Sequence, residues 1–247
     1  MSTLLFFNDR NLYLSEGFVR DYGKPEPLYD CAYSDGKNYA ASLPQVFREN
    51  GRYYMLYGAN DSASGKHVYL IAESDDGLHF RPCNDAAARA GLEDPVLPYQ
   101  VLDTRAGEIG VLLKDEAAPA EERYKLLMCY YEGGEGERMQ DDRVFVSPDG
   151  FRFRQLPGIW HRTGTEPGVG GFYNREKACW EIIARPDAGN RKICRIETKD
   201  FRTFTDPELM MEASGEDVPM SELYGMPVFE YKGYYFYNGK TDILLSL

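Results

Sequence analysis

Three carboxylic acids stand where this sequence changes from one type of segment to another, and such groups can give and take protons. Glu222 precedes an apolar run that contains Pro227, and an aromatic segment follows this run. Asp115 follows an apolar run, and Asp9 lies near the start of the chain. Aromatic neighbours such as Tyr224 would partly bury the carboxyl group of Glu222, which raises its pKa and suits it to donate a proton.

A repeated segment sets the frame for these acids. The pattern Ser/Thr-x-Asp-(Gly)-x-x-Phe closes at Phe80, Phe153 and Phe204, and each copy follows an aromatic, strand-like stretch. Asp-Gly reverses the chain, and we expect the aromatic residue that follows to anchor the outer strand against the neighbouring repeat. Repeats of this size indicate a propeller or a solenoid, and four-stranded antiparallel blades fit best. A β-sandwich is the alternative.

The expected elements are almost all strands. In chain order we expect strands within residues 4–14, 44–48, 52–58, 67–72, 110–114, 123–131, 143–146, 170–173, 179–185 and 191–197. A hairpin turn is expected at Glu49-Asn50-Gly51, because glycine supplies a positive φ. Short helical turns are expected only at residues 85–92 and 117–122.

Composition limits the classes of partner. The 247 residues carry a net charge of −12, which argues against nucleic acids and anionic membranes. The five cysteines form neither a CxxC pair nor a zinc spacing, so we expect no metal and no other cofactor, and a reducing, cytoplasmic location. We find no signal peptide and no stretch long enough to span a membrane.

These segments resemble the five-bladed β-propeller glycoside hydrolases, the superfamily of invertases, arabinanases and xylosidases. The likeness covers about Leu4 to Tyr235, and its most specific parts are Glu73–Phe80, Lys114-Asp115 with Glu122–Lys125, and Glu222–Phe229. It implies an all-β, five-bladed propeller. We expect one domain over residues 1–247 with about four blades visible, either shortened at its C-terminal end or closed by pairing with a second chain.

The resemblance also implies roles for the acids. Family members place three acids around an axial funnel, and Glu222 corresponds to the general acid. Asp115 would be the transition-state stabiliser, although Glu116 replaces the proline of the family's Arg-Asp-Pro step. The first acid is expected where this sequence has Leu43, so Asp9 is the candidate nucleophile or base.

Each of these residues also has a purely structural interpretation. Glu222 could satisfy backbone donors between blades, and Asp115 could form a turn at the entry to a loop. Trp160 and His161 could form a sugar-binding wall, with Tyr224 lining the funnel, but Trp160 and His161 equally suit a surface loop.

Two functions remain open on the sequence. The first is hydrolysis of glycosidic bonds in an oligosaccharide, in which one carboxyl group protonates the leaving oxygen and a carboxylate acts on the opposite face. The second is a non-catalytic propeller that binds carbohydrate or protein. An unpaired strand at the open edge of a blade would favour homo-oligomers.

Overall fold

The computed structural model describes residues 33–36, 38–40, 44–61, 67–102, 107–132, 139–158, 161–162, 166–185, 192–213, 221–231, 234–237 and 240–243. The chain divides into two compact units, residues 1–32 and 33–247, and every described residue lies in the second. The strand expected within residues 4–14 therefore lies outside the described residues. A single domain over residues 1–247 stays a prediction.

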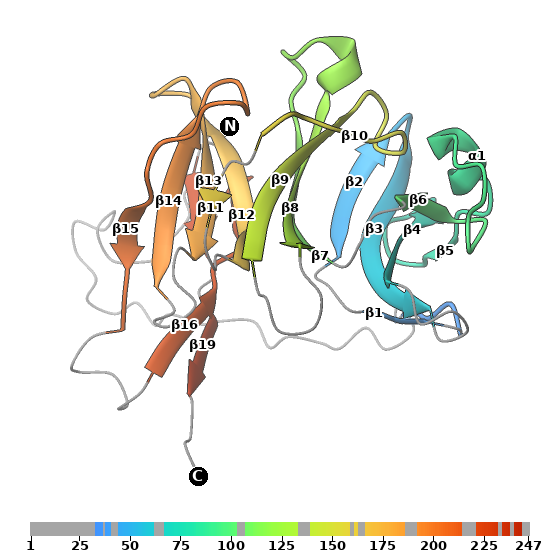
Figure 1. The fold of residues 1–247 in the computed structure, drawn as a ribbon, viewed down its shortest axis with the longest axis horizontal. Helices are drawn as coiled ribbons and strands as arrows, with labels where there is room; N and C mark the ends of the chain where they lie inside the picture. Colours follow the sequence, from blue (N-terminus) through green and yellow to red (C-terminus); the bar gives the residue numbers. More distant parts are fainter. Residues whose placement is uncertain are drawn as a thin grey trace, which may run out of the picture. The chain divides into compact units, whose positions relative to one another are not determined.

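Antiparallel sheets follow one another along the second unit (Figure 1). The first holds β1 (Asn38–Ala40), β2 (Gln45–Glu49), β3 (Arg52–Asp61), β4 (His67–Ser74), β5 (Arg81–Pro82) and β6 (Gln100–Leu102). The second holds β7 (Gly107–Lys114), β8 (Tyr124–Glu132), β9 (Met139–Ser147), β10 (Arg154–Gln155) and β11 (His161–Arg162). The third holds β12 (Glu166–Asn174), β13 (Cys179–Arg185), β14 (Ile193–Thr198) and β15 (Glu208–Met211). The last strands form two pairs, β16 (Ser221–Gly225) with β19 (Lys240–Ile243) and β17 (Val228–Tyr231) with β18 (Tyr234–Tyr237).

The order of strands identifies the architecture. The third sheet runs β12-β13-β14-β15 in chain order, and the second runs β7-β8-β9-β10. Sequential antiparallel sheets of this kind are the blades of a propeller, whereas a sandwich exchanges strands between two facing sheets. The prediction of an all-β, incomplete propeller is confirmed for the described residues.

The hairpin between β2 and β3 forms where the sequence predicts it. Asn50 and Gly51 have φ values of 50° and 83°, and Glu49 is in register with Arg52. Positive φ at both central residues matches the twist of the two strands, which is why Asn-Gly suits this turn.

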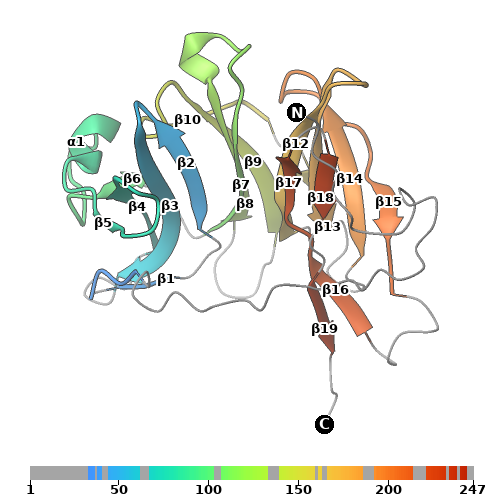
Figure 2. The same ribbon diagram turned by 180° about the vertical axis from the view of Figure 1, so that it is seen from behind.

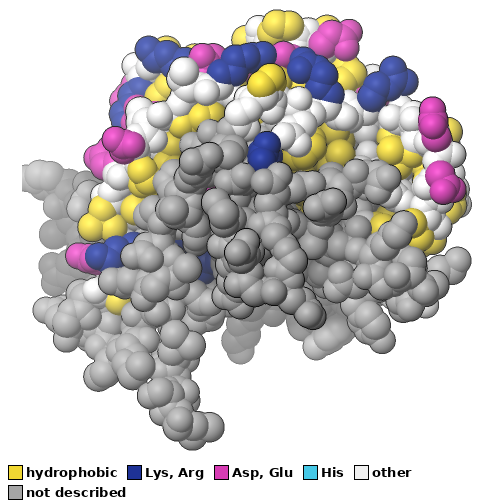
Figure 3. Space-filling view, viewed as in Figure 1, with side chains coloured by type: hydrophobic (Ala, Val, Ile, Leu, Met, Phe, Trp, Pro, Cys, Tyr) yellow, Lys and Arg dark blue, Asp and Glu magenta, His cyan; other side chains and the backbone are white. Residues whose placement is uncertain are grey.

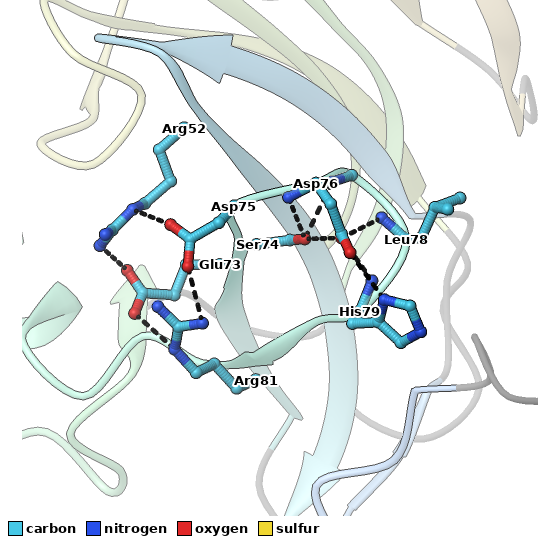
Figure 4. A network of polar contacts seen from close by, with 9 residues as sticks. Arg52, Glu73, Ser74, Asp75, Asp76, Leu78, His79 and Arg81 are labelled. Carbon is cyan, nitrogen blue, oxygen red and sulfur yellow. Dashed lines mark hydrogen bonds and ion pairs between the residues drawn. The ribbon is translucent and has the colours of Figure 1, made fainter.

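The repeated Asp turn is a compact set of side chain to backbone hydrogen bonds (Figure 4). Ser74 Oγ accepts a hydrogen bond from the Gly77 amide at 2.9 Å and donates one to Asp76 Oδ1 at 2.8 Å. Asp76 Oδ1 accepts hydrogen bonds from the amides of Leu78 and His79, both at 2.8 Å. Serine and aspartate thus bind the backbone groups that the reversal leaves without a strand partner.

The second sheet repeats this turn with Ser147, Asp149 and Gly150, and the third with Thr198 and Asp200. Gly77 and Gly150 have φ values of 79° and 80°. Phe201 takes the equivalent position in the third turn with φ 56°. A bulky residue in this left-handed region is strained, so surrounding contacts must hold it.

The first and second sheets share one hydrophobic core. Phe151, which follows Gly150, is fully buried, and its ring lies 5.1 Å from that of Tyr54 in β3. Phe80 and Phe153, the predicted anchors, pack on the same core but are only partly buried. A Cβ on Gly150 would lie 2.6 Å from Cε2 of Phe47, so the turn approaches β2 closely.

The other junctions follow the same principle. A second cluster joins the second and third sheets around Leu113, Leu127 and Trp180, with Phe204 packed against it. At the last junction a Cβ on Gly170 in β12 would lie 2.8 Å from the backbone nitrogen of Val228. Glycine therefore lets the first strands of neighbouring blades approach each other closely.

In the part of the chain that the structure describes, helical structure is short, as predicted. α1 spans Ala86–Ala90, and a 3₁₀ turn spans Ala120–Glu122. Within the described residues no helix is long and apolar enough to cross a membrane. On the face shown in Figure 3, described basic and acidic side chains are intermixed along the upper edge.

Candidate functional site

The direction of the first strand in each blade distinguishes the two ends of the blades. These strands are β2, β7, β12 and β17, and β12 contacts both β7 and β17. Blades repeat around an axis, so their first strands run in the same direction along it. The β7–β8 connection is drawn at one end of the sheets and β16 at the other in both Figure 1 and Figure 2.

The predicted site residues fall at different ends. Asp115 directly follows the C-terminal residue of β7, whereas Glu222 and Tyr224 lie in β16, which precedes β17. The topology therefore does not bring Asp115 and Glu222 together. His161 lies in β11, in register with Asp142 of β9. Asp9 and Trp160 lie outside the described residues, as does Leu43. The roles assigned to the six predicted site residues stay predictions.

One further acid, not among the predicted site residues, lies toward the end that carries β16. Glu166 is the first residue of β12, and its register partner is Arg185. Pro167 follows it, so Glu166-Pro167 has the acid-then-proline order of the family steps that were compared with Asp115 and Leu43. That order was the signal that could have identified it.

Strand register gives Glu222 an acidic partner. In the β16–β19 pair, Glu222 is directly opposite Asp242, and Leu223 is opposite Thr241. Directly opposite positions are the closest cross-strand neighbours in an antiparallel pair. The register therefore adds Asp242 to the residues worth testing around Glu222.

A cleft of about 700 Å³ surrounds Asp115 at the other end. Its walls come from the β7–β8 connection, the β12–β13 turn and the β14–β15 turn. Charged side chains of both signs line it, the basic ones being Lys114, Lys125, Lys199 and Arg202 and the acidic ones Asp115, Glu116, Glu122 and Asp200. Tyr173, Trp180 and Phe201 form its aromatic part.

Asp115 shapes the loop that forms one wall of this cleft. Its backbone amide donates a hydrogen bond to the Arg123 carbonyl at 2.8 Å, and its Oδ1 accepts one from the Ala117 amide at 3.0 Å. This is the turn-forming role that the sequence analysis gave as the structural alternative. Its Oδ2 lies 3.9 Å from Lys125 Nζ.

Glu122 ties the two sides of the cleft together. Its carboxylate accepts hydrogen bonds from Arg154 at 2.9 Å and from Arg202, in the turn of the third sheet, at 2.8 and 3.0 Å. Burial acts to raise the pKa of Glu122, but these two guanidinium groups outweigh it and hold the pKa below its ordinary value.

Lys125 forms the buried floor between the walls. Its side chain is 3% exposed, its amine donates to the Glu122 carbonyl, and the amine lies 5.3 Å from the centre of the Phe201 ring. Burial lowers the pKa of Lys125, and the Asp115 and Glu122 carboxylates oppose this.

One cluster in the third sheet consists of residue types that can bind a metal ion, but its carboxylates form ion pairs with basic side chains of the protein. Cys179, Glu181 and Glu197 offer ligand atoms within 4.8 Å of one another. Lys177 Nζ lies 2.5 Å from Glu197 and 3.2 Å from Glu181, and Arg195 contacts both carboxylates. These paired charges leave the cluster poorly suited to a metal ion.

Comparisons with known proteins identify the fold. The chain matches a thermostable family-43 glycoside hydrolase with 15% identity and a TM-score of 0.50 over 78% of this chain and 61% of that one. It matches β-1,2-mannobiose phosphorylase from Listeria innocua with 13% identity and a TM-score of 0.57 over 87% and 70%. It matches exo-inulinase from Aspergillus awamori with 12% identity and a TM-score of 0.55 over 85% and 45%.

The chain has the β-propeller fold of glycoside hydrolases. The predicted resemblance is thus confirmed at the level of the fold. No protein-family model matches the sequence, and neither does any curated protein. This propeller chain spans between 45% and 70% of the length of the three structures described above.

Proposed function

We propose that this propeller is a glycoside hydrolase that cleaves glycosidic bonds of an oligosaccharide by carboxylate catalysis. The observation that carries the proposal is the fold. The chain matches the structure of a family-43 glycoside hydrolase over 78% of its length and that of an exo-inulinase over 85%.

Glu222 is the proposed general acid, and the face reached by the start of β12 and by β16 is the proposed reaction site. Glycoside hydrolysis requires a second carboxylate across the scissile bond. Glu166 is an acid at the start of β12, the first strand of the third blade, and β12 contacts β17. Glu166 is therefore the first candidate for this role, and Asp9 is the candidate from the family resemblance. A role for Asp115 as stabiliser stays a prediction that the topology does not favour.

Activity should be tested with a panel of aryl glycosides and with fructo-, manno- and xylo-oligosaccharides. Each substrate is assayed with and without inorganic phosphate, because one matched structure is a phosphorylase and phosphorolysis would release a sugar phosphate. Glu222→Gln removes the acid while keeping the shape of the side chain, and Glu93→Gln, at an exposed position between α1 and β6, is the control.

Turnover by the wild type and by Glu93→Gln, with loss in Glu222→Gln, supports the proposal. Equal turnover in all three proteins would remove Glu222 from the mechanism. No turnover on any substrate, with sugar binding retained, would favour the non-catalytic propeller.

A further inference from the structure

We infer that the cleft around Asp115 binds a neutral oligosaccharide at a second site, at the opposite end of the blades from Glu222. The choice of carbohydrate rests on the proposed function. The existence of the site rests on the cleft itself.

The cleft has the size and construction of a binding site. Its volume of about 700 Å³ lies within the range of roughly 300–1,000 Å³ found for ligand pockets. Its walls come from two adjacent blades, so a ligand here would contact both blades at once.

The cleft is held in shape before any ligand binds. Arg202 of one wall binds Glu122 of the other through two contacts of 2.8 and 3.0 Å. The buried Lys125 amine binds the Glu122 carbonyl between them. A rigid site loses less freedom on binding, which favours affinity.

The lining favours a neutral, polyhydroxylated ligand. Four basic and four acidic side chains line the cleft, so neither an anion nor a cation meets a field of opposite sign. An apolar ligand would have to remove these charges from water, which is costly. Sugar hydroxyls both donate and accept hydrogen bonds, so they can use both kinds of charged group.

Three groups of the lining present a surface or a charge that such a ligand can contact. Tyr173 is 44% exposed, and its ring lies 5.4 Å from that of Trp180, which forms an aromatic surface for a sugar ring. Lys199 is exposed and makes no hydrogen bond or ion pair with the part of the chain that the structure describes. Asp115 Oδ2 lies 3.9 Å from Lys125 Nζ, which is longer than a hydrogen bond.

The test measures binding of fructo-, manno- and xylohexaose by calorimetry in a Glu222→Gln background, so that bound sugar is not hydrolysed. Tyr173→Ala and, separately, Lys199→Glu are compared with Leu209→Ala, which removes an exposed side chain from β15 outside the cleft. Circular dichroism confirms that each variant is folded, and each substitution is also made with Glu222 intact for aryl glycoside assays.

We expect Tyr173→Ala to weaken hexaose binding about tenfold, the loss of one aromatic contact of roughly 1.4 kcal/mol. Lys199→Glu should weaken it as well, and Leu209→Ala should not. Turnover of small aryl glycosides should be unchanged, because they react at the other end of the blades. If no hexaose binds, or if both cleft variants bind as the control does, the site is refuted. Absence of aryl glycoside turnover counts against the proposed hydrolase alone.

Discussion

The hydroxyl group of Tyr124 in β8 donates a hydrogen bond of 2.5 Å to Oε2 of Glu49 at the end of β2. Glu49 is 8% exposed, and its carboxylate also contacts Arg123 at 2.7 Å and Lys114 at 3.1 Å. One carboxylate of the first blade thus carries three contacts from the second. The junction between these blades is therefore polar at its rim and apolar within.

Replacing Glu49 by Gln should destabilise the fold by about 1–3 kcal/mol at pH 7, because the partly buried cations Lys114 and Arg123 would then face an uncharged side chain. Burial acts to raise the pKa of Glu49, but the hydrogen bonds from Tyr124 and Lys114 outweigh it and hold the pKa below its ordinary value. A lowered carboxylate pKa stabilises the fold above the unfolded-state pKa and loses this effect as pH falls through the folded-state pKa. Urea unfolding at pH 7, 5 and 3 should show the difference between the proteins shrinking toward pH 3, and a constant difference would contradict this.

Gly150→Ala should cost more stability than Gly51→Ala. Both residues have φ near 80°, so an alanine pays about 1–2 kcal/mol of backbone strain at either position. Only at Gly150 would the new Cβ meet a neighbour, Phe47, within 4 Å, which adds about 1–3 kcal/mol of overpacking. Thermal unfolding of both variants checks the order, and Phe47→Leu should partly rescue Gly150→Ala but not Gly51→Ala.

Asp115→Asn should change kcat/KM on aryl glycosides by less than about threefold, whereas Glu222→Gln should lower it by about 10²–10⁴-fold. The reason is that Asp115 follows β7 at its C-terminal end and already serves as a turn former for Ala117. Glu166→Gln should resemble Glu222→Gln. A loss of activity in Asp115→Asn equal to that in Glu222→Gln, in a folded protein, would restore the family-based role.

Cys83 should resist iodoacetamide in the native protein. Its side chain is fully buried, and burial together with the hydrogen bond to Asp85 raises the pKa of its thiol to about 12, so little reactive thiolate exists at pH 8. Burial also raises the pKa of Cys179 and Cys194. Mass spectrometry after labelling in buffer and in urea should find these three cysteines modified only in urea.

Much of the fold is predictable from sequence because strand and turn signals are local. Asn50-Gly51 specifies its turn, and the Asp turns recur at the predicted positions. Strand ends are less predictable, since β12 begins at Glu166, well before the predicted Gly170. Glu166 is paired with Arg185 of β13, a contact between distant segments that no local pattern shows.

The site is less predictable than the fold. The end of a blade at which an acid lies depends on whether the acid comes before or after the first strand of that blade. The family resemblance matched Asp115 by its neighbours in sequence alone, and the structure places it after β7. The cleft needs residues from two blades, so no single segment could reveal it.

The third turn sets a practical limit on redesign of this chain. Copying the glycine of the first two turns onto Phe201 would relax the backbone, yet it would also empty the space beside Trp180 and Lys125 that the ring now fills. Consensus design, in which repeats are changed toward one common sequence, often stabilises repeat proteins. In this chain it should lower the folding stability if it replaces Phe201 by glycine.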